Sequence, residues 1–213
     1  MQLTNGHYIL TYGQQEKLMQ ARTRRRLAPD VRRQEIIEAA ERLLKRDGPA
    51  VRVEDVVCEA AAAKGTFYLY FPTWDDLLEA IRRRIIRQFD EAHPIHIKTG
   101  AELDWPSLLE QLAVAFVDSM AELGGLHTVL FHTDFAHRRP IPEGDNPISR
   151  LIGVIRAGQD AGAFAKADAY LTGRLLFAVI HETADILEAG EDRKRALDAM
   201  RWTLRKALEP EVP

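Results

Sequence analysis

Histidines and carboxylates are the residues of this 213-residue chain that could do metal or acid–base chemistry. His181-Glu182 resembles the start of an HExxH zinc site, but the second histidine is missing and Asp185 stands nearby. His93 and His96 lie together in a stretch that contains Pro94. The chain has no GxSxG elbow, phosphate loop or dinucleotide-binding glycine motif. We therefore expect no enzyme, no metal and no cofactor, with a metal-dependent enzyme as a remote alternative.

A second group of side chains is suited to binding nucleic acid. The net charge is −3, yet residues 22–33 contain six arginines and one aspartate. A basic segment on an otherwise acidic chain favours a nucleic-acid contact at one end, although a solvated charged face has the same composition. The candidate DNA-binding residues are Arg24, Arg25, Arg26, Arg52, Lys64, Thr66, Tyr68 and Tyr70. By contrast, we expect Arg82, Arg83 and Arg84 to lie on a solvated helical face.

A third group combines aromatic rings with histidines, most densely between residues 127 and 137. Apolar cavities with a few polar groups are the usual form of small-molecule sites. Each of these residues alone is more often ordinary core. Together they favour a pocket wall, suited to a planar or aromatic ligand and built from Trp105, Phe116, Met120, His127, Phe131, His132, Phe135, Phe177 and His181.

The elements that position these residues are all helical. Apolar residues recur at helical spacing and no segment alternates as a strand does, so the sequence predicts an all-α fold. Thr73 and Asp76 form a predicted capping box before the fourth helix. The expected helices span residues 32–46, 53–60, 64–70, 74–92, 106–123, 126–135, 148–162, 168–189 and 191–209.

The composition also limits where the protein works. Cys58 is the only cysteine and lies in an apolar stretch, so we expect a buried thiol and a reducing cytoplasm. No run approaches the roughly 20 apolar residues of a spanning helix, and the first residues lack the basic and apolar regions of a signal peptide. We therefore expect a cytoplasmic protein without a membrane partner.

Residues 32–78 resemble the DNA-binding domain of the TetR family of bacterial regulators. Two short helices joined by a tight turn and braced by a longer helix form a helix-turn-helix, whose second short helix enters the major groove. The resemblance covers about 47 residues, and its third segment is specific. It is carried by Ile36-Ile37-Glu38-Ala39-Ala40, Asp55-Val56-Val57, Lys64-Gly65-Thr66-Phe67-Tyr68-Leu69-Tyr70-Phe71 and Asp75-Asp76-Leu77-Leu78.

The chain departs from the family pattern in and near the turn. Ala61-Ala62-Ala63 replaces the common Gly-Val-Ser, which removes a capping hydroxyl and a residue suited to a left-handed turn. Trp74 stands where a phosphate-binding lysine is frequent, and Arg52 where Thr or Ser usually opens the second helix. We hypothesise that the arginines at 24–26 compensate by entering the minor groove.

The resemblance implies a domain plan and a function. We expect a flexible basic extension at 1–29, a three-helix helix-turn-helix domain at 30–73, and a larger helical effector-binding and dimerisation domain at 74–213. The implied partners are a double-stranded, palindromic DNA operator, a small-molecule effector that releases the repressor, and a second copy of the chain. A TetR-like dimer with a degenerate DNA-binding head is the main alternative. The expected dimer interface comprises Leu171, Leu175, Ala178, Ala196, Met200, Thr203 and Leu204.

Overall fold

The computed structural model describes residues 28–95, 103–138 and 146–210. Over these ranges the chain forms helices and no strand, so the predicted all-α class is confirmed. The elements are α2 (Pro29–Asp47), the short 3-10 helix η1 (Gly48–Ala50), α3 (Val53–Glu59), α4 (Lys64–Tyr70), α5 (Trp74–Ala92), α6 (Trp105–Ala121), α7 (Gly125–Phe131), α8 (Asp134–Arg138), α9 (Pro147–Asp160), α10 (Ala169–Glu188) and α11 (Arg193–Leu208).

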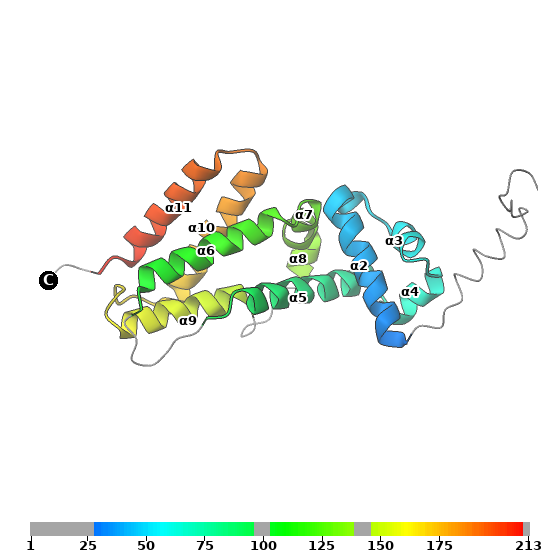
Figure 1. Cartoon of the computed structure of the whole chain (residues 1–213), viewed down its shortest axis with the longest axis horizontal. Coiled ribbons are helices and arrows are strands. Elements are labelled where there is room, and N and C mark those ends of the chain that lie inside the picture. Colours follow the sequence, from blue (N-terminus) through cyan, green and yellow to red (C-terminus); the bar gives the residue numbers. More distant parts are fainter. Residues whose placement is uncertain (1–27, 96–102, 139–145, 211–213) are drawn as a thin grey trace, which may run out of the picture.

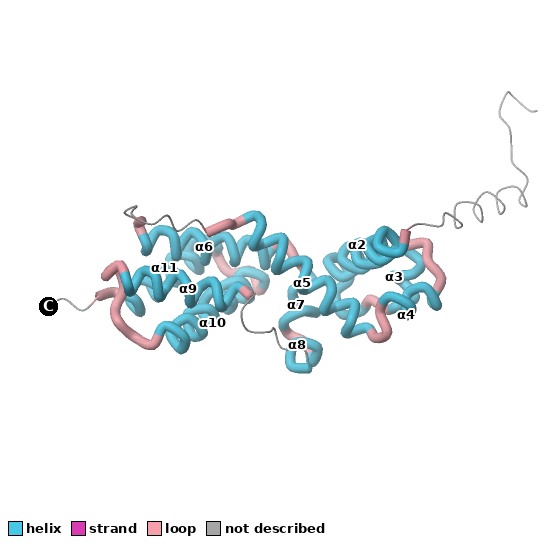
Figure 2. Tube along the Cα trace, turned by 90° about the horizontal axis from the view of Figure 1, so that it is seen from below, coloured by secondary structure: helices cyan, strands magenta, loops and turns pink. Residues whose placement is uncertain are grey.

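The molecule is elongated, with two groups of helices joined by α5 (Figure 1). Helices α2, α3 and α4 form one end, which we call the head. Helices α6, α9, α10 and α11 form the other end. Together with α7 and α8, the two short helices nearest the head, they form the part that we call the body (Figure 2). Helix α5 runs from the head into the body, so both parts share one rigid rod.

Local sequence signals explain most helix boundaries. The Thr73 hydroxyl accepts the Asp76 backbone N–H at 3.2 Å, and the Asp76 carboxylate accepts the Thr73 N–H at 3.0 Å. The predicted capping box of α5 is thereby confirmed. Asp104, Asp168 and Asp192 cap α6, α10 and α11 in the same manner, each accepting backbone N–H groups of the first turn.

One helix prediction was wrong. The sequence predicts a single helix over 126–135, but the chain breaks at His132 and Thr133, between α7 and α8. The Thr133 hydroxyl donates to the carbonyl of Val129 at 2.8 Å. This side-chain bond competes with helix continuation, which is the usual effect of threonine near a helix end.

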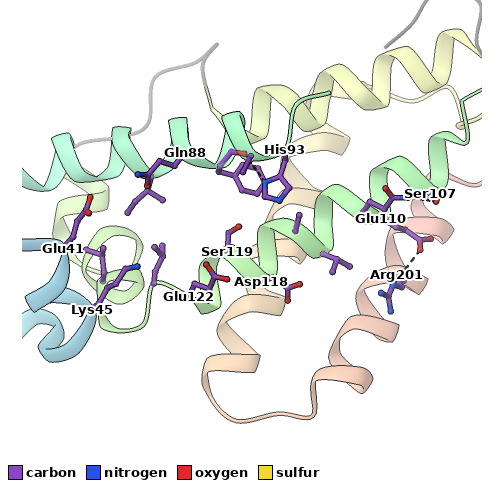
Figure 3. Close-up of a pocket in the computed structure, with 18 residues that line it drawn as sticks. Glu41, Lys45, Gln88, His93, Ser107, Glu110, Asp118, Ser119, Glu122 and Arg201 are labelled. Atoms are coloured by element: carbon purple, nitrogen blue, oxygen red, sulfur yellow. Dashed lines mark hydrogen bonds and ion pairs between the residues drawn. The ribbon is translucent and has the colours of Figure 1, made fainter. Parts of the chain in front are cut away.

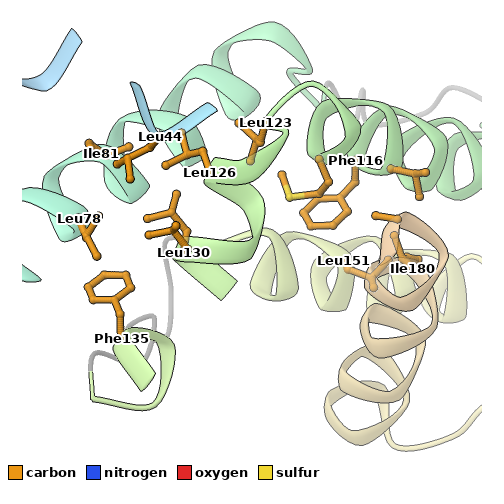
Figure 4. Packing of buried hydrophobic residues seen from close by; sticks show 14 of the residues in the cluster. Leu44, Leu78, Ile81, Phe116, Leu123, Leu126, Leu130, Phe135, Leu151 and Ile180 are labelled. Carbon is orange, nitrogen blue, oxygen red and sulfur yellow. The ribbon is translucent and has the colours of Figure 1, made fainter. Parts of the chain in front are cut away.

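A continuous hydrophobic core extends from the head into the body. Leu44 of α2 and Ile81 of α5 gather beside Leu126 and Leu130 of α7, all four fully buried (Figure 4). Farther along, Phe116 of α6 packs with buried residues of α9 and α10. This core contains residues on both sides of the expected domain boundary between residues 73 and 74. The division into two domains at that point therefore stays a prediction.

Two expectations about single side chains were wrong. Arg82 does not lie on a solvated face: it is 2% exposed, pairs with Glu79 at 2.5 Å, and its guanidinium carbon lies 4.8 Å from the centre of the Phe135 ring. A buried charge needs such a partner. Cys58 is exposed rather than buried, because the buried side of α3 is formed by Val56.

No single helix among the described residues is long and apolar enough to cross a membrane. Helices α6 and α7 reach the necessary length and composition only when taken together, and the chain bends by 108° between them. Their apolar residues are largely part of the core.

The head meets the body through direct backbone contact. Helix α7 packs against α2, and a Cβ placed on Gly125 would lie 2.8 Å from the Cα of Gly48 and 2.9 Å from the carbonyl oxygen of Leu44. Real Cβ atoms do not approach other atoms so closely. Only glycine at position 125 therefore lets the two backbones touch.

We expect Gly125→Ala to lower the free energy of unfolding by about 1–3 kcal/mol, the usual cost of forcing an extra carbon into a packed site. Gly153→Ala is the matched control, because a Cβ there meets nothing within 4 Å inside α9. That control should raise stability by about 0.5–1 kcal/mol through helix propensity. Urea unfolding followed by circular dichroism measures both. An unchanged unfolding free energy for Gly125→Ala would contradict the close contact.

The turn between α3 and α4 contains the one non-glycine residue with positive φ among those described. Ala61 has φ of 47°, so the chain adopts the left-handed turn although alanine replaces the glycine common in the family. The left-handed conformation costs an L-residue roughly 1–2 kcal/mol. The helix-turn-helix geometry is thus retained at the expense of local strain.

Ala61→Gly should raise the free energy of unfolding by about 0.5–1 kcal/mol, because relief of the left-handed strain exceeds the greater flexibility of glycine in the unfolded chain. Ala60→Gly is the neighbouring control: Ala60 has φ of −79°, so glycine there only adds flexibility and should destabilise. Thermal unfolding of both variants distinguishes these signs. Destabilisation by Ala61→Gly would show that position 61 is not strained.

Candidate functional site

The short helices α3 and α4 are held in place by buried aromatic residues and by α2. Phe67 and Phe71 are 0% and 1% exposed, in agreement with the expectation that they form core. The Arg32 guanidinium donates to the carbonyl of Ala60 at 3.3 Å, at the end of α3. Trp74 stacks on Phe67 with ring centres 6.4 Å apart. Trp74 therefore serves the packing of α4, in the position where a phosphate-binding lysine is frequent.

The outer face of α4 is polar at its start and apolar near its end. Lys64 is exposed, Thr66 is half-buried, and Tyr68 is 46% exposed. Tyr70 is half-buried and packs against the core, so its ring is less accessible than the sequence analysis expected. Leu69 is 77% exposed and was not among the candidate residues. Its exposure could have been predicted, because Leu69 lies on the opposite side of the helix from the buried Phe67 and Phe71.

The charged side chains of the head are engaged by neighbours. Lys64 pairs with Glu54 of α3 at 2.5 Å, and this hydrogen bond raises the pKa of Lys64 and lowers that of Glu54. The Arg52 guanidinium donates to the carbonyls of Pro49 and Val51 at 2.9 and 3.3 Å. It therefore braces the loop before α3. The candidate residues Arg24, Arg25 and Arg26 lie outside the described residues.

The aromatic and histidine candidates of the body do not line one cavity. Trp105 and Met120 are buried in the core of α6, and Phe135 lies against Arg82. The remaining six form a chain of ring contacts across α6, α7 and α10, with neighbouring ring centres 4.9–6.3 Å apart; they are Phe116, His127, Phe131, His132, Phe177 and His181.

Asp185 joins the three histidines of this group. His132 Nε2 lies 3.0 Å from Asp185 Oδ1, and His181 Nδ1 lies 3.3 Å from Asp185 Oδ2. His127 Nε2 is 3.7 Å from Asp185 Oδ1. Burial lowers the pKa of His181, an effect that Asp185 partly opposes. The structure thus assembles a three-histidine, one-carboxylate cluster that the spacing of residues 181–185 alone did not indicate.

The structure contains a groove that the sequence analysis missed. A cavity of about 710 Å³ lies between α5 and α6, bordered by α2 and by Arg201 of α11 (Figure 3). Its polar lining includes four carboxylates and two basic groups, together with apolar side chains. Burial raises the pKa of Glu41 at the head end. The charged members are Glu41, Lys45, Glu110, Asp118, Glu122 and Arg201.

The part of the predicted dimer interface that lies on α11 is mostly buried within the protomer. Ala196, Met200 and Leu204 are 6%, 2% and 0% exposed, so they cannot present an apolar surface to another molecule. Thr203 is half-buried and its hydroxyl donates to the carbonyl of Ala199. Exposed apolar side chains of α10 and α11 include instead Leu171, Leu175, Ala178 and Trp202.

Comparison with known proteins agrees with this architecture. The family model for bacterial regulatory proteins of the tetR family matches residues 36–81, from α2 into α5. The fatty acid metabolism regulator protein of Bacillus subtilis (strain 168) is 26% identical over 159 residues, which cover 70% of this chain and 79% of that protein.

Two solved structures share the fold. The fatty acid degradation regulator FadR from Bacillus halodurans superposes with a TM-score of 0.63 at 18% identity, over 81% of this chain and 93% of that one. A TetR transcription regulator from Haloarcula marismortui gives 0.61 at 21% identity, over 84% and 100%. The matched head and the helical body support a DNA-binding transcriptional regulator whose head is similar to that of the tetR family.

Proposed function

We propose that this regulator is a ligand-responsive repressor that binds a palindromic operator as a homodimer and leaves it when a small-molecule effector binds. The observation that carries the proposal is the backbone contact between Gly48 of the head and Gly125 of the body. Because nothing flexible separates the two, a rearrangement of α7 must shift the head. A ligand acts on DNA affinity only if it binds one of the two arrangements more tightly. Such a protein would act in the cytoplasm.

The exposed side of α4 supports the DNA-binding half of the proposal. Lys64 is suited to an ion pair with a phosphate. The hydroxyl groups of Tyr68 and Thr66 can donate hydrogen bonds to phosphates or base edges. The exposed Leu69 is suited to the methyl group of a thymine. On binding, Lys64 would exchange its contact with Glu54 for a phosphate oxygen. A head with these side chains displayed argues against the alternative of a degenerate reading helix.

We expect Lys64→Gln to weaken operator binding and to reduce the slope of log affinity against log salt concentration by about 1, because one phosphate contact is lost. The operator is first found by selecting genomic fragments with the purified protein. Affinity is then measured at several salt concentrations. Binding without any preferred sequence would instead favour the degenerate head.

Lys206→Gln provides a matched control for this experiment. Lys206 of α11 pairs with Glu209 at 2.6 Å and has the same 55% side-chain exposure as Lys64, but it lies in the body. Equal salt slopes for the two variants would exclude Lys64 as a phosphate contact. A protein lacking residues 1–26 tests the predicted DNA contact of Arg24, Arg25 and Arg26 in the same assay. An unchanged salt dependence of operator affinity would exclude that contact.

The exposed apolar face of α10 and α11 supports the homodimer. Leu171, Leu175 and Trp202 are 56%, 69% and 64% exposed, although side chains of this kind are usually withdrawn from water. Helices α10 and α11 pack against each other, and exposed apolar residues on adjacent helices are typical of interaction surfaces. Two copies of α10 and α11 can cover this face as a four-helix bundle. We accordingly retain Leu171, Leu175, Ala178 and the half-buried Thr203 from the predicted interface and add Trp202.

Leu175→Glu should convert the dimer to monomers and reduce operator affinity at least tenfold, because it places a charge in the centre of the apolar face. Leu69→Glu is the control: Leu69 is even more exposed, at 77%, but lies on α4. It should remain dimeric while losing DNA affinity. Sedimentation equilibrium gives the mass of each variant. A dimeric Leu175→Glu protein would place the interface elsewhere.

The groove between α5 and α6 is our candidate for the effector site, since it touches both α2 of the head and α6 of the body. Glu110 and Asp118 in its lining are paired with Arg205 and Arg193, and apolar side chains complete the lining, which favours a ligand with an apolar part. The two Bacillus relatives are named as regulators of fatty acid metabolism or degradation, and we propose genes of that metabolism as the first candidates for regulation by this protein.

A further inference from the structure

Three imidazole rings surround one carboxylate at the junction of α7 and α10. His127 comes from α7, His132 from the residues just after it, and His181 and Asp185 from successive turns of α10. One donor atom from each of the four residues lies within 4.8 Å of all the others. The segments that contribute them are about 50 residues apart in the chain, so tertiary packing creates this cluster.

His127 is the member whose surroundings call for a ligand. Its side chain is 2% exposed, and its Nδ1 lies 3.0 Å from Glu188 Oε2. A carboxylate can only accept a hydrogen bond, so Nδ1 carries a proton, and in a ring with one proton Nε2 presents a lone pair. Nε2 is buried and has no hydrogen-bond partner. The oxygen that faces it at 3.7 Å, Asp185 Oδ1, is an acceptor as well.

We propose that this cluster binds a divalent transition-metal ion, with Zn²⁺ the best match, through His127, His132, His181 and Asp185. A cation between His127 Nε2 and Asp185 Oδ1 would satisfy both acceptors. Three imidazole nitrogens and one carboxylate suit Zn²⁺, whereas Mg²⁺ and Ca²⁺ prefer oxygen ligands. Four protein ligands leave no open position for a substrate, so the site is structural or regulatory.

The four donor atoms lie within 4.8 Å of one another and would draw together to close on an ion. Bonds of about 2.0–2.2 Å in a tetrahedral site place ligand atoms roughly 3.4 Å apart. The His132–Asp185 and His181–Asp185 separations, 3.0 and 3.3 Å, are already near that value. His132 has 39% of its side chain exposed, which gives the ion a route of entry.

The surroundings of the cluster are those of a metal site. Glu188 orients His127, as outer carboxylates commonly orient histidine ligands. The ring of Phe131 lies 5.5 Å from that of His127 and 5.6 Å from that of His181. Phe131 thus gives the cluster one apolar side.

Metal binding would also fix the position of α7. Helix α7 begins at Gly125, which touches Gly48 of the head, and bears His127 half a turn later. An ion that ties α7 and His132 to α10 therefore selects one arrangement of the head. This regulatory step rests on the proposed function, whereas the metal site itself does not.

The test uses the full chain without an affinity tag, stripped of metal by a chelator. Titration with Co²⁺ should give the visible absorption bands of a four-coordinate site at one ion per chain, and Zn²⁺ should displace it. His132→Ala and Asp185→Asn should weaken binding at least 100-fold. His93→Ala is the control, because His93 directly follows α5, beside Phe89 and outside the cluster. It should bind as the wild type does.

Circular dichroism of each metal-free variant establishes that it folds, and Zn²⁺ should raise the melting temperature of the wild type and of His93→Ala only. Absence of the Co²⁺ bands, or equal Co²⁺ affinity of His132→Ala and the wild type, would overturn the site. Operator affinity is then compared with and without Zn²⁺. An unchanged affinity would overturn the regulatory step alone, and a protein that binds Zn²⁺ but no operator would refute the proposed function instead.

Discussion

The arrangement of this molecule depends on one close approach, that of the backbone at Gly48 to the backbone at Gly125. No side chain separates the head from the body at this point, and a Cβ on Gly125 would collide with the backbone of Gly48. Closely packed interiors change between discrete arrangements rather than deforming gradually. The close packing of Gly125 on Gly48 therefore restrains the head relative to α7.

The sequence was informative wherever local chemistry decides the structure. The bounds of α4 and α5 were predicted to the residue, because Pro72 cannot continue a helix and Thr73 with Asp76 caps the next one. The all-α class followed from apolar spacing alone. At Ala61 the residue type argued against a left-handed turn, whereas the family resemblance predicted one. The backbone adopts the left-handed conformation, as the resemblance predicted.

The sequence was least informative where distant segments meet. Arg82 is followed by two further arginines, and nothing local indicates that Glu79 and Phe135 enclose it. On α11 the apolar stripe was correctly recognised, but periodicity cannot tell whether such a stripe faces the protomer or a second copy; Met200 and Leu204 face the protomer. The histidine cluster was hidden for the same reason, since only the packing of α7 on α10 brings His127 to Asp185.

The single rod α5 has a mechanical consequence. It contains 19 residues, which corresponds to a length of roughly 28 Å. A tilt of about 5° at its body end would carry the head end sideways by about 2.5 Å at that length. In a symmetric pair of molecules the displacement occurs twice, so two reading helices set about 34 Å apart, one turn of DNA, would change their separation by up to about 5 Å. A small tilt at the body end would thus be amplified along α5 into a mismatch comparable to a base-pair step.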